Sequence, residues 1–140
     1  MKNILHISDL HLSTIEGLGF PEKDISKVLT LLIKDIGGFN FSIDSIFFTG
    51  DLSFSGIDAQ FDSLIANFID PLLQYLKLSY DDLYVVPGNH DVERSKVSIF
   101  ELSYRDKATT DELNSLSTAI NSSNQIWART SSYKLFLNKI

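Results

Sequence analysis

Cysteine is absent from this chain of 140 residues, which excludes both a disulfide framework and a metal site built from thiolates. Basic residues are also scarce: 12 lysines and arginines against 18 aspartates and glutamates leave a formal net charge of −6. Most non-specific affinity for duplex DNA comes from neutralising its phosphates, so this acidity argues against a broad electrostatic grip on nucleic acid. A phosphorylated substrate remains compatible with it, since bound metal ions can supply positive charge locally.

Long apolar runs are absent as well. No stretch reaches the roughly 18 apolar residues that a membrane-spanning helix needs. The mostly apolar run at residues 4–7 is too short for the core of a signal peptide. We therefore expect a cytoplasmic protein without membrane association, with one domain and a modest hydrophobic core.

Three short apolar runs, at residues 4–7, 43–48 and 83–86, predict buried strands. Each run ends in polar or glycine-containing sequence. Two segments with hydrophobic residues at helical spacing, 21–36 and 57–76, lie between them. Pro71 removes a backbone donor inside the second segment, so we expect a kink or a split near Asp70. The alternation of strands and helices predicts an α/β fold with a parallel sheet and crossover helices.

After Asp91 the pattern becomes mainly helical. Helices are predicted at residues 97–104, 111–120 and 125–140. In the last of these, the residues expected on one apolar face are Tyr133, Phe136, Leu137 and Ile140. Trp127 is expected in a core or an interface.

Polar clusters follow each predicted strand: Asp9-Leu10-His11, Gly50-Asp51 and Gly88-Asn89-His90-Asp91. The carboxyl ends of parallel strands meet at one edge of a sheet, so the three clusters should converge there. Carboxylate, imidazole and carboxamide groups are suitable ligands for manganese, iron or zinc. The sequence therefore predicts a metal site at this edge.

The three clusters in this order resemble the motifs of the calcineurin-like metallophosphoesterases, over residues 3–94. The resemblance implies the N-terminal half of a four-layer αββα sandwich, in which two sheets pack face to face between helices. Residues 1–140 would form a partial domain, with residues 95–140 mainly helical. The implied cofactor is a pair of divalent ions of manganese, iron or zinc.

The resemblance also assigns roles to residues. The implied metal ligands are Asp9, His11, Asp51, which would bridge both ions, and Asn89. His90 would be the general acid for the leaving oxygen, while metal-activated hydroxide attacks phosphorus. Asp91 would orient and polarise His90.

Alternatives stay open for two further residues, Arg94 and His6. The run from Gly88 to Arg94 resembles a subgroup fused to larger proteins of bacterial defence, and Arg94 could hold a substrate phosphate. A plain surface role for Arg94 is an equal alternative. His6 lies outside the motifs, within the first predicted strand, and is expected to be a core histidine.

The family completes its site with a further histidine and a later Gly-His-x-His motif. This chain has three histidines, and none follows His90. We therefore expect a C-terminal remainder or a partner chain to supply the missing ligands, and we expect the isolated chain to be inactive.

The function implied is metal-dependent hydrolysis of a phosphate ester. A phosphodiester, in a nucleic acid or a nucleotide, is favoured, because the Gly-Asn-His-Asp form and Arg94 look more like the nuclease and cyclic-nucleotide branches. Three alternatives stay open. They are a non-catalytic interaction module, a truncated fragment that retains the fold, and a protein that binds one metal.

Overall fold

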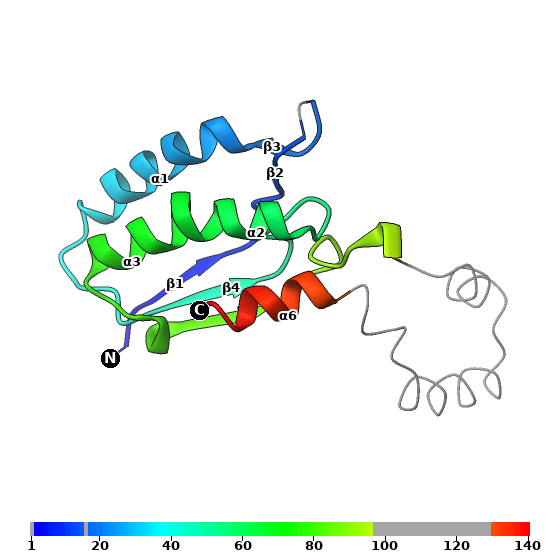
Figure 1. Cartoon of the computed structure of the whole chain (residues 1–140). Coiled ribbons are helices and arrows are strands. Elements are labelled where there is room, and N and C mark those ends of the chain that lie inside the picture. The colour runs from blue at the N-terminus through cyan, green and yellow to red at the C-terminus, as the bar shows by residue number, and fades with distance from the viewer. Residues whose placement is uncertain (1, 16, 97–129) are drawn as a thin grey trace, which may run out of the picture.

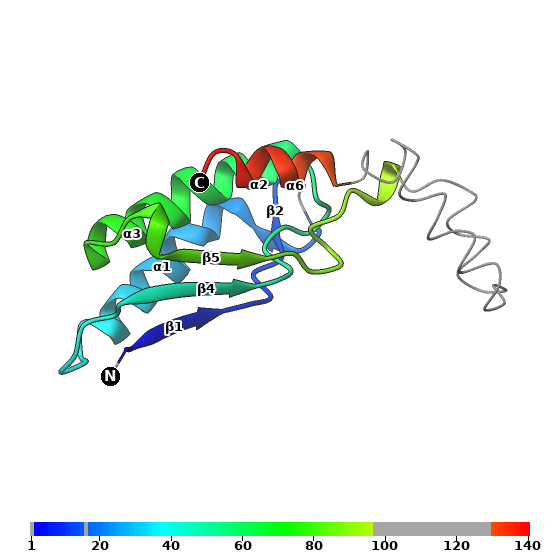
Figure 2. The same cartoon turned by 90° about the horizontal axis from the view of Figure 1, so that it is seen from below.

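The computed structural model describes residues 2–15, 17–96 and 130–140. Its central sheet has three parallel strands in the order β1 (Ile4–Ile7), β4 (Ser45–Thr49) and β5 (Leu83–Val86). Figures 1 and 2 show the strands side by side, with all their carboxyl ends at the same edge. The predicted parallel α/β arrangement is confirmed, although β4 begins two residues later than its apolar pattern suggested.

Helices cover one face of this sheet (Figure 2). Helix α1 (Glu22–Ile36) connects β1 to β4, and helices α2 (Asp58–Leu64) and α3 (Asp70–Leu76) connect β4 to β5. Because side chains alternate along a strand, Ile46 and Phe48 face the helices and are fully buried. No helix among the described residues is long and apolar enough to cross a membrane.

Pro71 does not split its helix. A π-helical turn, Ile65–Ile69, joins α2 to α3 directly ahead of the proline. The N–H of Asp70 donates to the carbonyl of Ile65, five residues back. A wide turn of this kind accommodates a proline, which has no N–H and whose ring crowds the preceding turn. The expected disturbance near Asp70 is therefore present as a π turn within a continuous helix.

The segment after β1 contains a second, smaller sheet that the sequence did not predict. Strands β2 (Leu12–Ser13) and β3 (Phe20–Pro21) pair in parallel, and Leu12 also bridges to Ser53. Strands of two residues are too short to show an alternating pattern, so only tertiary contacts reveal them.

The C-terminal helix α6 (Ser131–Leu137) packs against α2, as Figure 1 shows. The Phe136 ring is fully buried and stacks on Phe61 with ring centroids 4.9 Å apart. Tyr133 is buried beside it, as predicted. Leu137 was expected on the same face but is 41% exposed, because it follows Phe136 by one residue and so turns away by about 100°. The helices predicted at 97–104 and 111–120, the start of the last helix and Trp127 lie outside the described residues.

The opposite face of the sheet is left open by the described residues. It carries Ile4, Tyr84 and Val86, which are between 52% and 58% exposed. Phe47 stacks on Tyr84 in the same face, with ring centroids 4.7 Å apart. The placement of His6 in the core was wrong: it is exposed on this open face. There its Nε2 lies 2.5 Å from the Thr49 hydroxyl, because the strand alternation turns residue 6 away from the helices.

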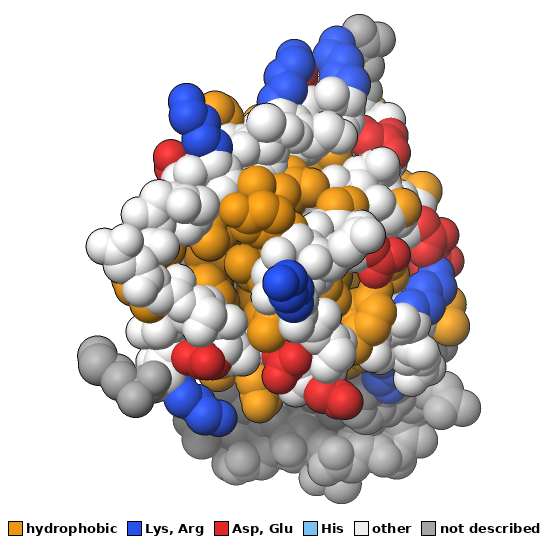
Figure 3. Space-filling view, turned by 90° about the vertical axis from the view of Figure 1, so that its left-hand side faces the viewer, with side chains coloured by type: hydrophobic (Ala, Val, Ile, Leu, Met, Phe, Trp, Pro, Cys, Tyr) orange, Lys and Arg blue, Asp and Glu red, His pale blue; other side chains and the backbone are white. Residues whose placement is uncertain are grey.

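The end of the molecule at the amino ends of the strands is also partly apolar. Figure 3 shows hydrophobic side chains gathered there, with charged groups around them. In the loop between α1 and β4, the exposed rings of Phe39 and Phe41 stack on each other at 4.9 Å. The polar clusters predicted to bind metal lie at the other end of the strands.

Candidate metal centre

The three polar clusters meet at the carboxyl edge of the sheet, as predicted. The N–H of Asp9 donates to the Gly50 carbonyl at 3.1 Å, and the N–H of His11 donates to the Asp51 carbonyl at 2.8 Å. The N–H of His90 donates to Oδ1 of Asp51 at 2.8 Å. Hydrogen bonds donated by backbone N–H groups therefore hold the loops after β1, β4 and β5 together.

Three of the predicted metal ligands share an uncommon backbone conformation. Asp9, His11 and Asp51 have φ angles of 57°, 47° and 54°, in the left-handed region. Lys77 is the one other non-glycine residue with positive φ in the described part of the chain. This conformation costs roughly 1–2 kcal/mol per residue, and such strain collects at functional sites. Lys77 ends helix α3, a common place for this conformation, whereas Asp9, His11 and Asp51 lie together in loops at the edge of the sheet, as residues of a functional site do.

The side chains form a compact group around His11. Its Nε2 lies 3.8 Å from Oδ1 of Asp9 and 4.0 Å from Oδ2 of Asp51. Potential ligand atoms of His11, Asp51 and His90 all lie within 4.8 Å of one another. These separations exceed hydrogen-bond length. They suit an ion between the groups, since two ligands each about 2.1 Å from a metal lie roughly 3–4 Å apart.

A buried nitrogen of His11 gives a second sign of fit. Its Nδ1 is buried and has no hydrogen-bond partner among the described residues. A buried polar atom without a partner is unfavourable, and it is normally explained by water, a ligand or a metal. The carboxylates of Asp9 and Asp51 lie beside the other ring nitrogen, Nε2, and with it they form a donor set that fits a divalent cation.

Two predicted residues are less closely placed. Asn89 is exposed in the turn between Gly88 and His90, so its amide stands at the same edge. Arg94 begins the 3-10 turn η3 (Arg94–Lys96), but its side chain is outside what the structure describes. The roles of both residues stay predictions.

Asp91 is the fully buried carboxylate of the site. Its Oδ1 accepts hydrogen bonds from the N–H of Ser53 at 2.8 Å and from the Ser53 hydroxyl at 3.0 Å. Its Oδ2 accepts from the N–H of Gly88 at 2.9 Å. We call this arrangement of Ser53, Gly88 and Asp91 the carboxylate latch. It ties the loop that carries Asp51 to the turn that carries His90.

His90 is oriented by a different group. Its Nδ1 lies 2.8 Å from the main-chain carbonyl of Phe54. A carbonyl can only accept, so Nδ1 carries the hydrogen, and any proton that His90 exchanges with a substrate must pass through Nε2. The resemblance gave this orienting role to Asp91, whose carboxylate instead bonds Ser53 and Gly88. The sequence could not show this, because the partner is a main-chain atom of another loop.

Helix α6 covers the latch from the outside. The Ser132 hydroxyl lies 3.4 Å from Glu93, and Lys96 forms an ion pair with Glu93 at 2.7 Å. The hydrogen bond from Lys96 lowers the pKa of Glu93. Burial, with the nearby Asp91 carboxylate, raises the pKa of Tyr133, so this phenol is neutral. These contacts link the last helix to the turn that carries His90.

A family model for calcineurin-like phosphoesterases matches residues 2–138. The chain belongs to the calcineurin-like phosphoesterase family. It is also 28% identical over 88 residues to a protein of Arcobacter nitrofigilis named as a probable glycerophosphodiester phosphodiesterase, GpdQ. That match covers 63% of this chain and 29% of the relative's length.

Calcineurin-like phosphoesterases use divalent metal ions, and the group of His11, Asp51 and His90 agrees with this. The resemblance read from the motifs is thereby confirmed at the level of the family.

Replacing Asp91 by asparagine should destabilise this calcineurin-like phosphoesterase domain. The amide keeps one acceptor oxygen, but its NH₂ group meets the N–H donor of either Ser53 or Gly88. An unsatisfied buried group costs about 1–3 kcal/mol, and more when a charged acceptor is lost. We expect the free energy of unfolding in urea to fall by about 2–3 kcal/mol.

Asp81→Asn is the matched control, because Asp81 is exposed and a surface change costs less than about 0.5 kcal/mol. Equal stability of the two variants would contradict the structural importance of the latch.

A side chain at position 88 should disturb the metal centre of the phosphoesterase. A Cβ on Gly88 would lie 2.1 Å from Oδ1 and 2.4 Å from the backbone nitrogen of Asp51. The carboxylate must therefore move, and Gly88→Ala should weaken manganese binding by about 10–100-fold, as displaced supporting groups do. Calorimetric titration measures this. Gly38→Ala is the control, since its nearest atom lies at 3.3 Å, and unchanged affinity in both variants would refute the expectation.

Proposed function

We propose that this chain carries the metal-binding part of a phosphodiesterase. Its ligands are Asp9, His11, Asp51 and Asn89, for two divalent ions of manganese, iron or zinc, with Asp51 between them. The observation that carries the proposal is the left-handed backbone at Asp9, His11 and Asp51, which brings their side chains together at one sheet edge. Family membership supports the same chemistry.

Bound divalent ions supply Lewis acidity, which acidifies water and offsets negative charge on phosphoryl oxygens. The protein's own groups do the rest. Asp51 is held by the N–H of His90, so the carboxylate and the imidazole keep a fixed relation. His90, with Nδ1 bonded to Phe54, donates a proton from Nε2 to the leaving oxygen when the imidazole is charged.

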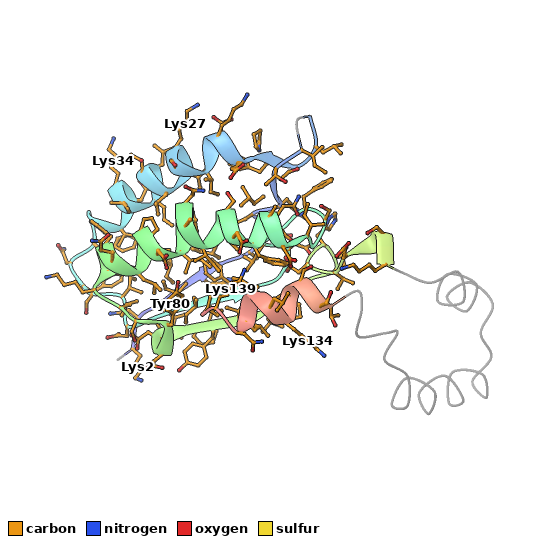
Figure 4. All side chains as sticks on the ribbon, viewed as in Figure 1. Lys2, Lys27, Lys34, Tyr80, Lys134 and Lys139 are labelled. Atoms are coloured by element: carbon orange, nitrogen blue, oxygen red, sulfur yellow. The ribbon has the colours of Figure 1, made fainter. Side chains whose placement is uncertain are left out.

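Apart from the proposed ions, the protein's own charged groups favour a diester over a monoester. A monoester carries about −1.5 to −2 at neutral pH, whereas a diester carries a single negative charge. The described residues that line the pocket beside the metal centre include Asp9 but no lysine or arginine. Lys27 and Lys34 project from α1, away from the sheet (Figure 4). The relative's name as a phosphodiesterase supports the same preference.

The remaining ligands would come from a C-terminal remainder or a partner chain, in a cytoplasmic protein. We infer that this missing part covers the open sheet face, because Ile4, Tyr84 and Val86 offer exposed apolar surface there. Burying such exposed apolar area is favourable by about 25 cal/mol per Å². The isolated chain would then bind metal weakly and hydrolyse little.

The test compares the protein encoded by the whole gene with the 140-residue chain. Each is assayed with manganese on an aryl phosphodiester and on the matching aryl monoester, before and after removal of metal by a chelator. We expect hydrolysis only by the gene product with metal, and faster for the diester. An inert gene product with manganese, iron and zinc would instead favour a non-catalytic module that uses the open sheet face to bind a partner.

A further inference from the structure

A pocket of about 530 Å³ opens beside the metal centre. One side is formed by Asp9, His11 and His90. The other side is apolar and carries Leu10, Phe20 and Phe54, each partly exposed. A ligand bound to the metal side can therefore place its organic part against two phenyl rings.

The two phenyl rings stand on backbone that is fixed to the metal-binding loops. The N–H of Phe20 donates to the carbonyl of His11 at 2.8 Å. The N–H of Phe54 donates to the carbonyl of Leu12 at 2.9 Å, and the carbonyl of Phe54 is bonded to His90. The backbone that carries the rings is thus fixed relative to the groups that would bind phosphate, which lowers the ordering cost of binding.

Gly19 makes room for this arrangement. Its φ is +61°, and a Cβ at this position would lie 2.7 Å from the Phe54 ring and 2.7 Å from the His11 carbonyl oxygen. The Phe54 ring therefore occupies the space that any other side chain at position 19 would need. Glycine is required here by close approach as well as by conformation.

The aromatic surface continues into the metal centre. The Phe54 and His90 rings have centroids 5.5 Å apart, and the His90 and His11 rings meet edge to face at 4.5 Å. A flat base can stack on such a surface, and one base on one aromatic ring contributes about 1–3 kcal/mol. A glycerol group has no flat apolar face and gains nothing comparable.

We propose that Phe20 and Phe54 form a base-binding subsite, so that the preferred substrate is a phosphodiester with a nucleoside next to the scissile phosphate. The proposal rests on the proposed phosphodiesterase function, whose substrate class it narrows. The glycerol diester suggested by the relative's name is the contrasting substrate.

The first experiment uses Phe54→Leu, which removes the ring but keeps the main-chain carbonyl bonded to His90. The kcat/KM of the gene product is measured with manganese on a nucleoside-bearing and a glycerol-bearing phosphodiester. We expect the ratio of the two values to fall by about 10-fold, the loss of one stacking contact. Phe39→Leu, in an exposed ring at the far end, should leave the ratio unchanged. An equal loss on both substrates would overturn the subsite.

The second experiment needs no hydrolysis. Adenosine, which has no phosphate, is titrated into the 140-residue chain and followed by NMR of the phenylalanine rings. We expect shifts at Phe20 and Phe54, weakened by Gly19→Ala but not by Gly17→Ala. Gly17 also has positive φ, +79°, but a Cβ there would meet nothing within 4 Å. Adenosine binding without any diester hydrolysis would support the subsite and refute the phosphodiesterase. Diester hydrolysis without adenosine binding at these rings would refute the subsite alone.

Discussion

Asp51→Asn is expected to abolish metal binding and, with it, hydrolysis. The Asp51 side chain is only 16% exposed, and its Oδ2 lies 4.0 Å from Nε2 of His11. Its Oδ1 already accepts the N–H of His90, so the carboxylate is fixed in place before metal arrives. Asparagine preserves size, tolerates the left-handed backbone and keeps one acceptor, but it removes the negative charge between the proposed ions. Activity should fall by more than roughly 100-fold, which is the typical loss when a residue that only orients a metal ligand is replaced.

Calorimetric titration with manganese and a hydrolysis assay measure the two losses separately. In the 140-residue chain, we expect a single weak binding event that disappears in the variant. Asp58→Asn is the control, because Asp58 is exposed at the start of α2. Retained manganese affinity in Asp51→Asn, or tight binding of two ions by the isolated chain, would show that the proposed ligand set is wrong.

His90→Ala should leave metal binding intact and slow turnover by about 10²–10⁴-fold, the usual effect of removing a general acid. The backbone N–H that holds Asp51 survives this change. The loss should be largest for an alkyl or nucleotide diester, whose leaving oxygen needs a proton. An aryl diester with a good leaving group should be much less affected.

The same variant distinguishes two roles for His90, because its imidazole lies within 4.8 Å of potential ligand atoms of His11 and Asp51. Loss of manganese affinity in His90→Ala would make His90 a ligand rather than the proton donor. His6→Ala serves as the matched histidine control. His6 lies on the open sheet face, and its removal should change neither manganese affinity nor the dependence on leaving group.

The fold was predictable where local patterns decide it. Two of the three strands, Ile4–Ile7 and Leu83–Val86, match the predicted ranges. A short apolar run between polar segments is typical of a buried strand and too short for a helix. The β2–β3 pair was missed, since strands of two residues depend on partners that are distant in sequence. The misplacement of His6 has a related cause. The alternation of side chains along the strand showed which residues share a face of the sheet. It did not show which face of the sheet the described helices cover.

The sequence predicted the residues of the site but not the hydrogen bonds that join them. Strand ends alone brought the three polar clusters to one edge, where the structure has them. The left-handed backbone of the ligands carries no sequence signal, because aspartate and histidine occur in many conformations. The bond from His90 to the Phe54 carbonyl and the latch around Asp91 also depend on loop packing that no motif spacing encodes.

The contacts between α6 and the turn after β5 join two parts of the chain that are distant in sequence. Lys96 donates to the Ser131 hydroxyl at 3.3 Å across 35 positions of sequence, so these two points are neighbours in space. The entropy cost of closing a connection between fixed neighbours grows slowly, by about 0.6 kcal/mol for each doubling of its length. The length of chain between these two neighbours therefore has little influence on whether α6 stays beside the metal-binding loops.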